Sequence, residues 1–500
     1  MLHTRLAVLG VGAALALPVA AHAATISIAT DPFTQATCKA STLTNHQANV
    51  EPDTFSNGST IVSAFQVGRV YDGGACAIGF ATSTDNGATW TNGLLPAITK
   101  FDGGSGPNDR ATDASVAYDA AHNVWLVSSL TLLEAGGLSG NAVVTSRSTD
   151  GGLTWGTPVT TASVSGTSDF DKNWIVCDNT ASSPFYGHCY TQWDDHGAGN
   201  RLEMSTSTDG GLTWGAAKTN NAGVIGGQPV VRPDGTVIVP TANANETAIG
   251  AFNSTNGGGS WSAVTTIATI RHHSVAGSLR EGPLPSAEID GGGTVYVAWT
   301  DCRFIRACKA NDIVLSHSLN PTGTSWSAVT RVPIDSTGSQ IDHFIPGLAV
   351  NRATSGSSAQ LGLTYYFYPR RSTSLGVGFV SSSNAGSTWS APQTVASDMP
   401  STWAATTSQG RMVGDYISTS FGSDNLAHAV FATASAPTSG SSCSSVLDNC
   451  GEPMATFVSG LAGSGSTSGA GAAVVFAGNG NTGAQSFWNL VDNNGSKHRD

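Results

Sequence analysis

The feature that most constrains the fold is an eight-residue pattern that recurs along the chain. Residues 148–155, Ser-Thr-Asp-Gly-Gly-Leu-Thr-Trp, return letter for letter at residues 207–214. Looser copies stand at residues 83–90, 254–261, 318–326 and 382–389. A pattern that recurs roughly every 45 to 65 residues indicates a repeat architecture.

Each copy has the composition of a tight turn that ends in a tryptophan. The two glycines after Asp150 tolerate positive φ angles without a steric penalty. The Asp side chain can accept hydrogen bonds from the amides of its own turn. The tryptophan buries a large aromatic surface beside it. We therefore expect self-contained structural turns and assign no chemistry to them.

Short apolar and aromatic stretches between the turns have the composition of β-strands. Each repeat offers an apolar first strand, an aromatic-rich second strand, a third strand that runs into the turn and a fourth after the tryptophan. First strands are expected at residues 51–56, 114–118, 174–177, 228–232, 286–289, 345–350 and 415–420. This order predicts an all-β β-propeller of four-stranded antiparallel blades. Seven blades are favoured, and six blades with an appended sheet are the alternative.

The chain divides into four segments. Residues 1–23 have the pattern of a secretory signal peptide that ends in Ala21-His22-Ala23. A lead-in at 24–48 precedes the propeller at 49–459, and 460–500 form a Gly/Ser-rich linker and tail. The strand that completes the last blade comes from 454–459, from 472–477 or from the lead-in. We expect a monomer that is secreted or periplasmic.

Charge limits the class of partner. Only 11% of the residues are charged, against about 25% in typical globular domains. The net charge of −12 argues against nucleic acid and against anionic membrane surfaces. A local arginine cluster could still bind an acidic glycan, so the expected partner is a glycan or polysaccharide.

The eight cysteines, an even number in an exported chain, predict disulfides. Local pairing is the simplest arrangement: Cys177 with Cys189, Cys302 with Cys308, Cys443 with Cys450 and, by elimination, Cys38 with Cys76. No cysteine or histidine spacing fits a metal cluster. The Asp-Gly-Gly loops at Asp72 and Asp102 are candidates for structural calcium, and no other cofactor is expected.

Charged and polar residues stand at or just before the first strands, whose leading ends should share one mouth of the propeller. Such a mouth suits acid/base work on a polar sugar. Asp72, in a loop, is a candidate general acid, Tyr416 a candidate nucleophile or proton donor, and Glu281 a third catalytic candidate. Candidate substrate-binding residues are Arg69, Arg280, Asp342, His343 and Arg411. The alternative is that these residues join neighbouring blades by ion pairs and hydrogen bonds.

The repeated turns resemble the Asp-box (BNR) repeats of the sialidase, or neuraminidase, superfamily, over roughly residues 50–435. Residues 61–69, Ile-Val-Ser-Ala-Phe-Gln-Val-Gly-Arg, also resemble the second strand of a sialidase's first blade. The resemblance implies a retaining exo-α-sialidase with a Tyr nucleophile, an Asp acid/base and three clamping arginines. Asp72 and Tyr416 match the family's Asp and Tyr. The family's Arg-Ile-Pro opening appears here as Val50-Glu51-Pro52, without the first Arg, and Gln228 stands where the family has a Glu that assists the Tyr.

Three functional interpretations follow, because a fold does not fix a function. The first is a secreted glycoside hydrolase of the sialidase type that cleaves terminal acidic sugars from glycans. The second is a polysaccharide lyase that uses His343 or Tyr416 as base and acid on a uronate. The third is a non-catalytic propeller that binds glycans or proteins.

Overall fold

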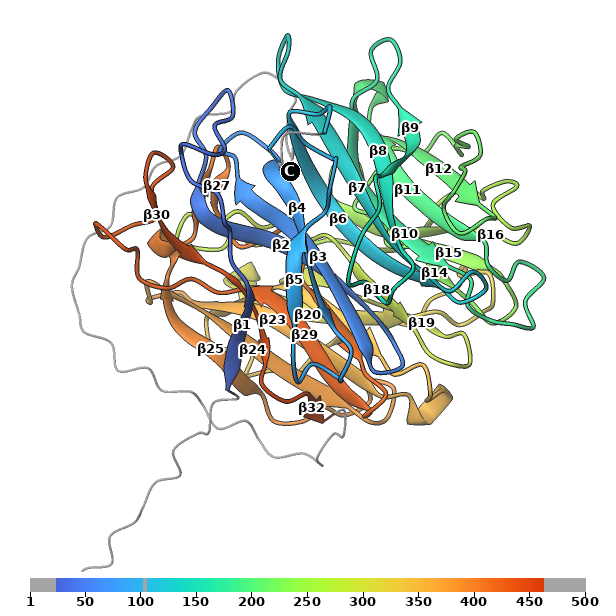
Figure 1. The fold of residues 1–500 in the computed structure, drawn as a ribbon. Coiled ribbons are helices and arrows are strands. Elements are labelled where there is room, and N and C mark those ends of the chain that lie inside the picture. Colours follow the sequence, from blue (N-terminus) through green and yellow to red (C-terminus); the bar gives the residue numbers. More distant parts are fainter. Residues whose placement is uncertain (1–23, 102–105, 463–500) are drawn as a thin grey trace, which may run out of the picture.

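A computed structural model describes residues 24–101 and 106–462. The expected signal peptide, Asp102, the candidate strand at 472–477 and most of the tail lie outside the described residues. The described chain is all-β with multiple sheets, consistent with a sialidase-like β-propeller (Figure 1). Helical structure in these ranges is limited to four 3₁₀ turns, at His196–Ala198, Arg306–Cys308, Gly356–Ser358 and Ser401–Trp403. None of the described helices is long and apolar enough to cross a membrane.

The first sheet contains two of the expected repeats. Its antiparallel strands are β2 His46–Asn57, β3 Thr60–Arg69, β4 Ala75–Ser83, β5 Thr91–Leu94, β6 Arg110–Asp119, β7 Val124–Leu133, β8 Ser139–Ser148 and β9 Val159–Ser163. A single residue pair, Ala75 with Ala111, joins β4 to β6. The sheet is therefore two groups of four strands that meet at one point. β30, Asp448–Glu452, is added parallel to β2.

Four further sheets follow in chain order. Their strands are β10 Phe170–Cys177, β11 Cys189–Asp195 and β12 Arg201–Ser207; β13 Val224–Ile225, β14 Val230–Val231, β15 Val237–Asn243, β16 Ala248–Ser254 and β17 Thr265–Thr269; β18 Ser286–Ile289, β19 Val295–Asp301, β20 Asp312–His317 and β21 Thr330–Arg331; and β22 Ile341–Val350, β23 Leu361–Pro369, β24 Ser374–Ser382 and β25 Gln393–Pro400.

Two of these sheets differ from the expected four full strands. The sheet of β10 to β12 has only three strands. After it, the side chains of Thr219 and Asn220 accept hydrogen bonds from nearby backbone amides, which competes with ladder pairing. The expected first strand at 228–232 is reduced to β14. Pro229 has no N–H to contribute to a ladder, and two glycines precede Gln228.

The last sheet combines both ends of the described chain. It consists of β28 Ser418–Phe421, β29 Leu426–Ala432, β31 Met454–Phe457 and β1 Thr25–Ala29, with β32 Leu461–Ala462 also paired to β29. In Figure 1 the dark blue β1 lies among the orange and red strands. Two of the three expected sources, the lead-in and residues 454–459, thus each supply a strand. A small hairpin, β26 Ala405–Thr407 and β27 Gly410–Met412, precedes this sheet.

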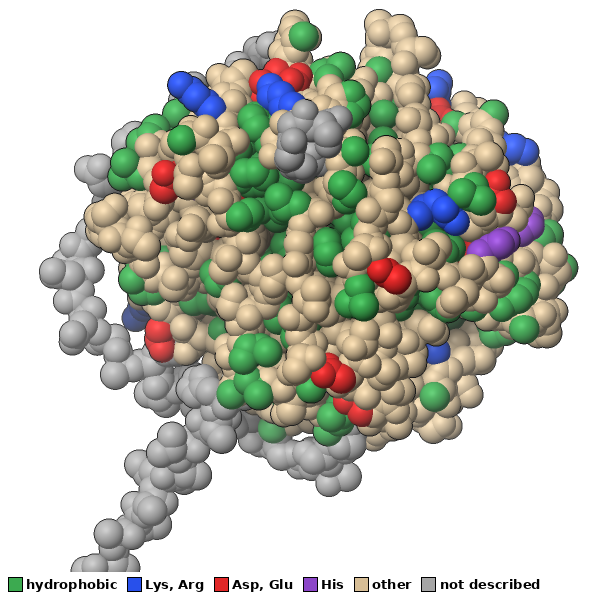
Figure 2. Space-filling model, in the orientation of Figure 1, with side chains coloured by type: hydrophobic (Ala, Val, Ile, Leu, Met, Phe, Trp, Pro, Cys, Tyr) green, Lys and Arg blue, Asp and Glu red, His purple; other side chains and the backbone are tan. Residues whose placement is uncertain are grey.

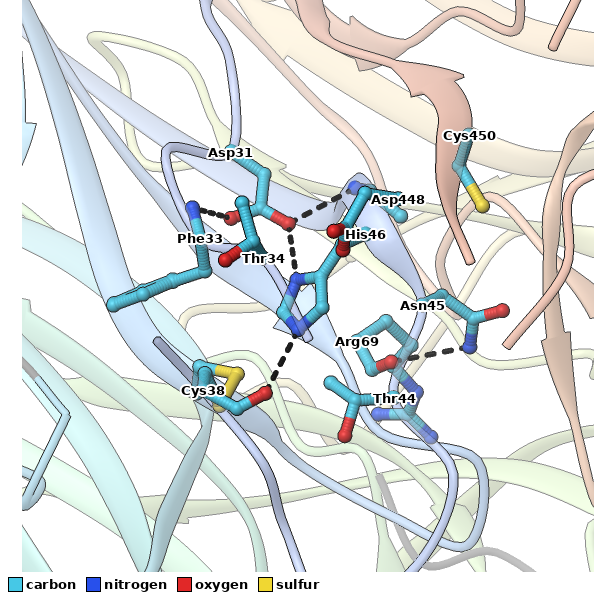
Figure 3. Close-up of polar contacts among 12 residues, drawn as sticks. Asp31, Phe33, Thr34, Cys38, Thr44, Asn45, His46, Arg69, Asp448 and Cys450 are labelled. Carbon is cyan, nitrogen blue, oxygen red and sulfur yellow. Dashed lines mark hydrogen bonds and ion pairs between the residues drawn. A yellow bond between two sulfur atoms is a disulfide. The ribbon is translucent and has the colours of Figure 1, made fainter. Parts of the chain in front are cut away.

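A buried pair, Asp31 and His46, ties the lead-in to β2 (Figure 3). His46 Nδ1 lies 2.9 Å from Asp31 Oδ2, and His46 Nε2 lies 3.0 Å from the carbonyl oxygen of Cys38. That carbonyl can only accept, so Nε2 carries a hydrogen, and one further proton is shared between Nδ1 and the carboxyl.

Four disulfides join the pairs expected from the sequence: Cys38–Cys76, Cys177–Cys189, Cys302–Cys308 and Cys443–Cys450. Such bonds are typical of extracellular or periplasmic proteins. The Cys38–Cys76 bond also fixes the lead-in to β4.

The repeated turns have the internal hydrogen bonds that the sequence predicts. Asp150 accepts from the amide of Thr154 at 2.9 Å and from its hydroxyl at 2.5 Å. Asp85 and Asp209 make the same two contacts within their own turns. Trp155, Trp261 and Trp389 are buried in the apolar clusters of the sheets, and Trp90, Trp214 and Trp326 are partly buried against such clusters. The turns are therefore structural.

Side-chain hydrogen bonds join most of the first strands to the next one. Backbone amides of Val116, Ile175, Ala287 and Leu348 donate to Asp53, Ser115, Gln228 and Ser286, at 2.8 to 3.0 Å. Thr419 donates to the Gly347 carbonyl at 2.9 Å, and Ser418 Oγ lies 2.8 Å from Thr54 Oγ1. These contacts join β2 to β6 and β6 to β10, and they lead from Gln228, before β14, through β18 and β22 to β28 and back to β2.

Candidate active site

Four of the first strands are distorted at equivalent points. The pairing register shifts within β2, β6, β10 and β22, and at each shift one non-glycine residue has a positive φ: Glu51 (57°), Asp113 (50°), Lys172 (48°) and Ile345 (50°). Such bulges re-aim a side chain and recur next to active sites. They bring Glu51, Asp113 and Lys172 into one buried cluster with the segment that precedes β28.

Asp415 is the centre of this cluster. Its Oδ1 accepts from Arg280 Nε at 3.0 Å and its Oδ2 from Arg280 Nη2 at 2.7 Å. Lys172 Nζ lies 2.8 Å from the same Oδ2 and 3.8 Å from Asp113 Oδ1. All four side chains are almost completely buried. The chain itself thus supplies a carboxylate to two cations.

Arg69 lies at the edge of this network. Its Nη1 donates to Gln66 Oε1 at 2.9 Å, and Gln66 in turn donates to Glu51 and to Thr112. Arg69 Nε and Nη2 are buried and have no hydrogen-bond acceptor among the described residues. Both oxygens of Asp113 are likewise without a hydrogen bond there. The cluster therefore retains unused donors on Arg69 and unused acceptors on Asp113.

Burial changes the charge of the cluster. Burial, together with the charges of Asp415 and Asp113, raises the pKa of Glu51 well above its usual value. Burial and the charges of Asp171 and Asp415 do the same for the pKa of Asp113. Both carboxyls therefore favour the neutral form. Three cations, Arg69, Lys172 and Arg280, are then left with fewer carboxylates, which favours the binding of one more anion.

A small cavity of about 20 Å³ opens beside these groups, with Asp113, Lys172, Asp415, Tyr416 and Trp174 in its wall. That volume is enough for about one water molecule. The hydroxyl of Tyr416 donates only a long hydrogen bond, 3.4 Å, to the carbonyl of Ala114, and its ring packs edge-on against Trp174. Burial and the nearby carboxyls raise the pKa of Tyr416 well above its usual value, so the phenol stays protonated.

The other two candidate catalytic residues have partners of their own. Asp72 accepts from Arg110 and from Thr42, at 2.6 Å each. Burial raises the pKa of Asp72, but these two hydrogen bonds outweigh it and lower the pKa. Glu281 binds His272 at 2.8 Å. Neither residue lines the cavity beside Tyr416.

The candidate binding residues divide between two places. Arg69 and Arg280 belong to the buried cluster. Arg411 instead donates to the carbonyls of Ala404 and Cys443, at 2.8 and 3.0 Å. Its backbone pairs with the segment that carries Arg280.

Asp342 and His343 have separate surroundings. Asp342 accepts from the amide of Asn311 and lies 3.1 Å from His273 Nδ1. Burial raises the pKa of Asp342 to about 6.

The two ring nitrogens of His343 face different carboxyls, Asp312 at 3.9 Å and Asp335 at 3.6 Å, and Arg331 binds both of these. Arg331 thus pairs the two carboxylates that flank His343, at 2.6 and 2.8 Å. His343 does not line the cavity beside Tyr416.

Sequence reasoning identified Asp113, Lys172 and Asp415 only as polar residues near strand starts, and it treated Glu51 as a departure from a family pattern. It missed Gln66, Thr112 and Asp194. Burial and the charges of Asp171 and Asp113 raise the pKa of Asp194 well above its usual value. The sequence did offer one signal for the cluster. In three first strands a charged residue comes directly before Pro52, Ala114 or Asn173.

No protein-family model matches this chain, and no curated protein does. Three solved structures with a related fold illustrate what it is similar to. A Dyadobacter fermentans protein of unknown function shares 15% identity, with 69% of this chain and 95% of that one covered, at a TM-score of 0.43. An intramolecular trans-sialidase from Ruminococcus gnavus shares 13% (86% and 97% covered, TM-score 0.39). Trypanosoma rangeli sialidase shares 12% (70% and 58% covered, TM-score 0.43). At these scores, the chain's own side chains must carry the functional argument.

Proposed function

We propose that the sheets form seven blades of one propeller, that the N-terminal β1 closes it, and that the chain is an exported protein that acts on acidic glycans. The hydrogen bonds that join β2 to β6, β6 to β10, β18 to β22, β22 to β28 and β28 back to β2 support the ring. The four disulfides support export.

The activity we propose is glycoside hydrolysis of the sialidase type. The observation that carries it is the buried Arg69, whose Nε and Nη2 lack acceptors in a cluster where Glu51 and Asp113 favour the neutral form. A sugar carboxylate would satisfy both nitrogens and the excess positive charge. A planar guanidinium matches a carboxylate better than any other side chain does.

Two groups, Tyr416 and Asp113, are available for chemistry. Tyr416 and Asp113 line the same cavity. In the proposed reaction the Tyr416 oxygen bonds to the anomeric carbon as the bond to the departing oxygen breaks. Neutral Asp113 gives its carboxyl proton to the departing oxygen and accepts the phenol proton on its other oxygen. Asp72 is kept ionised by its hydrogen bonds from Arg110 and Thr42, so it has no proton to give in this step. Water then releases the sugar with net retention.

The test is turnover of fluorogenic α-sialosides and of other glycosides with a carboxylate by the mature chain. We expect activity that is lost in Tyr416→Phe and in Asp113→Asn. Arg69→Gln should raise KM, because the clamp is removed. Arg371→Gln changes an exposed arginine and serves as the matched control. Absence of turnover on every carboxylate-bearing glycoside would reject the hydrolase.

A second candidate is a non-catalytic propeller that binds acidic glycans. Two observations favour it. Asp415 already forms ion pairs with Arg280 and Lys172. The cavity also has room for only about one water molecule, so a sugar ring enters only if the cavity walls move. Glycan-array binding without any turnover, lost in Arg69→Gln, would select this function over hydrolysis.

A further inference from the structure

A second and much larger cavity lies at the opposite end of the first strands. It has a volume of about 260 Å³ and is found where β2, β22 and β28 end, with Phe55, Asn57, Glu288, Asn351, Arg352 and Phe421 in its wall. Ligand pockets for drug-sized molecules measure about 300–1,000 Å³. A volume just below that range suits a ligand of one sugar ring.

Arg352 is the main unused donor in this cavity. Its guanidinium donates no hydrogen bond to any residue of the described ranges. It lies 5.3 Å above the ring of Phe55 and 3.8 Å from Glu288 Oε2, which is too long for a hydrogen bond. The two side chains are 40% and 29% exposed, so a ligand in the cavity can reach both. The pair offers a charged donor and a charged acceptor side by side.

The rest of the wall adds apolar and amide groups. Phe55 and Phe421 are partly buried and present ring surface, and Asn57 is exposed, with a side-chain amide that has no hydrogen-bond partner within the described part of the chain. A pyranose has C–H groups that pack on aromatic rings and hydroxyls that both donate and accept. Hydrogen bonds from hydroxyls to charged groups are the stronger kind.

The charge of the wall selects against an anionic ligand. Burial raises the pKa of Glu288 to about 7, so above that pH its carboxylate balances the charge of Arg352 and the cavity carries no excess positive charge, in contrast to the cluster around Arg69. We infer that this cavity is a binding site for a neutral pyranose unit of a glycan, held between Arg352, Glu288 and Asn57 over the ring of Phe55. The inference does not depend on the proposed function, because the two cavities lie at opposite ends of the first strands.

The test is binding of three neutral probes to the mature chain: the methyl glycosides of β-galactopyranose, β-glucopyranose and α-mannopyranose. Saturation-transfer NMR and calorimetry would measure it. We expect at least one probe to bind, and Arg352→Ala and Glu288→Gln each to weaken that binding at least tenfold. Arg371→Ala, at an exposed position, and Arg69→Gln, in the other cluster, should leave the affinity unchanged.

Three results would overturn the inference. One is that none of the probes binds at millimolar concentration. Another is that the affinity is the same in Arg352→Ala as in the wild type. The third is that N-acetylneuraminic acid binds here in preference to the neutral probes, with the same dependence on Arg352. Each variant is first checked for an unchanged unfolding temperature, so that a loss of affinity reports on the cavity.

Discussion

Asp415 binds Arg280 through both carboxylate oxygens, at 3.0 and 2.7 Å, in surroundings where both side chains are only 3% exposed. Lys172 approaches the same carboxylate from β10. The three residues come from parts of the sequence more than 100 residues apart, so this contact joins β10 to two distant segments of the chain that lie outside the strands. The Asp415 carboxylate is therefore the counter-ion of two of the three cations that an acidic substrate would bind.

Removal of this carboxylate should be costly. In Asp415→Asn the two cations lose their counter-ion in a buried site, and breaking such a pair typically costs about 3–5 kcal/mol. Urea unfolding at neutral pH measures the loss. Asp398→Asn, at an exposed position, is the control and should change stability by no more than about 0.5 kcal/mol. Equal stability of the two variants would show that the cluster does not hold the sheets together.

Asp53 should make the protein less stable as pH rises. Burial raises the pKa of Asp53 to about 7, so the folded state holds a proton that the unfolded state releases near pH 4. The stabilisation is complete below about pH 4 and is lost as pH rises through 7; three pKa units correspond to at most about 4 kcal/mol.

Asp53→Asn keeps an oxygen for the amide of Val116 and has no charge to bury. We therefore expect it to be more stable than the wild type at pH 8 and to show a flatter stability profile between pH 4 and 7. Unfolding free energies across this range measure both. A variant that is less stable than the wild type at pH 8 would contradict the assignment of the raised pKa to Asp53.

Local sequence patterns predict much of the fold because the interactions that form it are local. The turn at Asp150 is bonded within eight residues, and strand propensity and turn chemistry agree in most repeats. The prediction was less accurate where side chains compete with the ladder, as at Asn220, or where proline interrupts it, as at Pro229. The contribution of β1 to the last sheet was one of three possibilities, since sequence does not order distant edge strands.

The site is predicted less well because its contacts are long-range. Asp113, Lys172 and Asp415 can be recognised in the sequence as charged residues near strand starts. The bulges that orient these side chains toward one another depend on the neighbouring strands. Asp72 follows a promising Gly-Arg motif, and only the fold brings Arg110 and Thr42 against it. A candidate acid thereby becomes one member of an ion pair.

The repeated turns should tolerate asparagine but not alanine. Asn256 and Asn384 occupy the position of Asp150 in two copies and make the same contacts through Oδ1 and Nδ2. Asp150→Asn should therefore cost less than about 0.5 kcal/mol, whereas Asp150→Ala loses the side-chain acceptor for the amide of Thr154 and should cost about 1 kcal/mol. Thermal unfolding of the two variants measures the difference. If asparagine proves as costly as alanine, the charge rather than the hydrogen bonds stabilises the turn.

The Asp31–His46 pair should make the lead-in sensitive to alkaline pH. Burial disfavours the charged form of His46, but the hydrogen bond and charge of Asp31, with smaller help from Asp448, outweigh it and raise the pKa of His46. The stabilisation is complete below the unfolded pKa of about 6.5 and is lost as pH rises through the raised pKa of the folded state.

The variant Asp31→Asn can accept a hydrogen bond from the amide of Phe33 and donate one to neutral His46, so it should remove this pH dependence. Asp31→Ala should instead lower stability at every pH by about 1–3 kcal/mol, because it leaves buried groups unpaired. Unfolding between pH 6 and 10 measures both, with the partly exposed His122→Asn as control; an unchanged slope in Asp31→Asn would assign the pH dependence to another group.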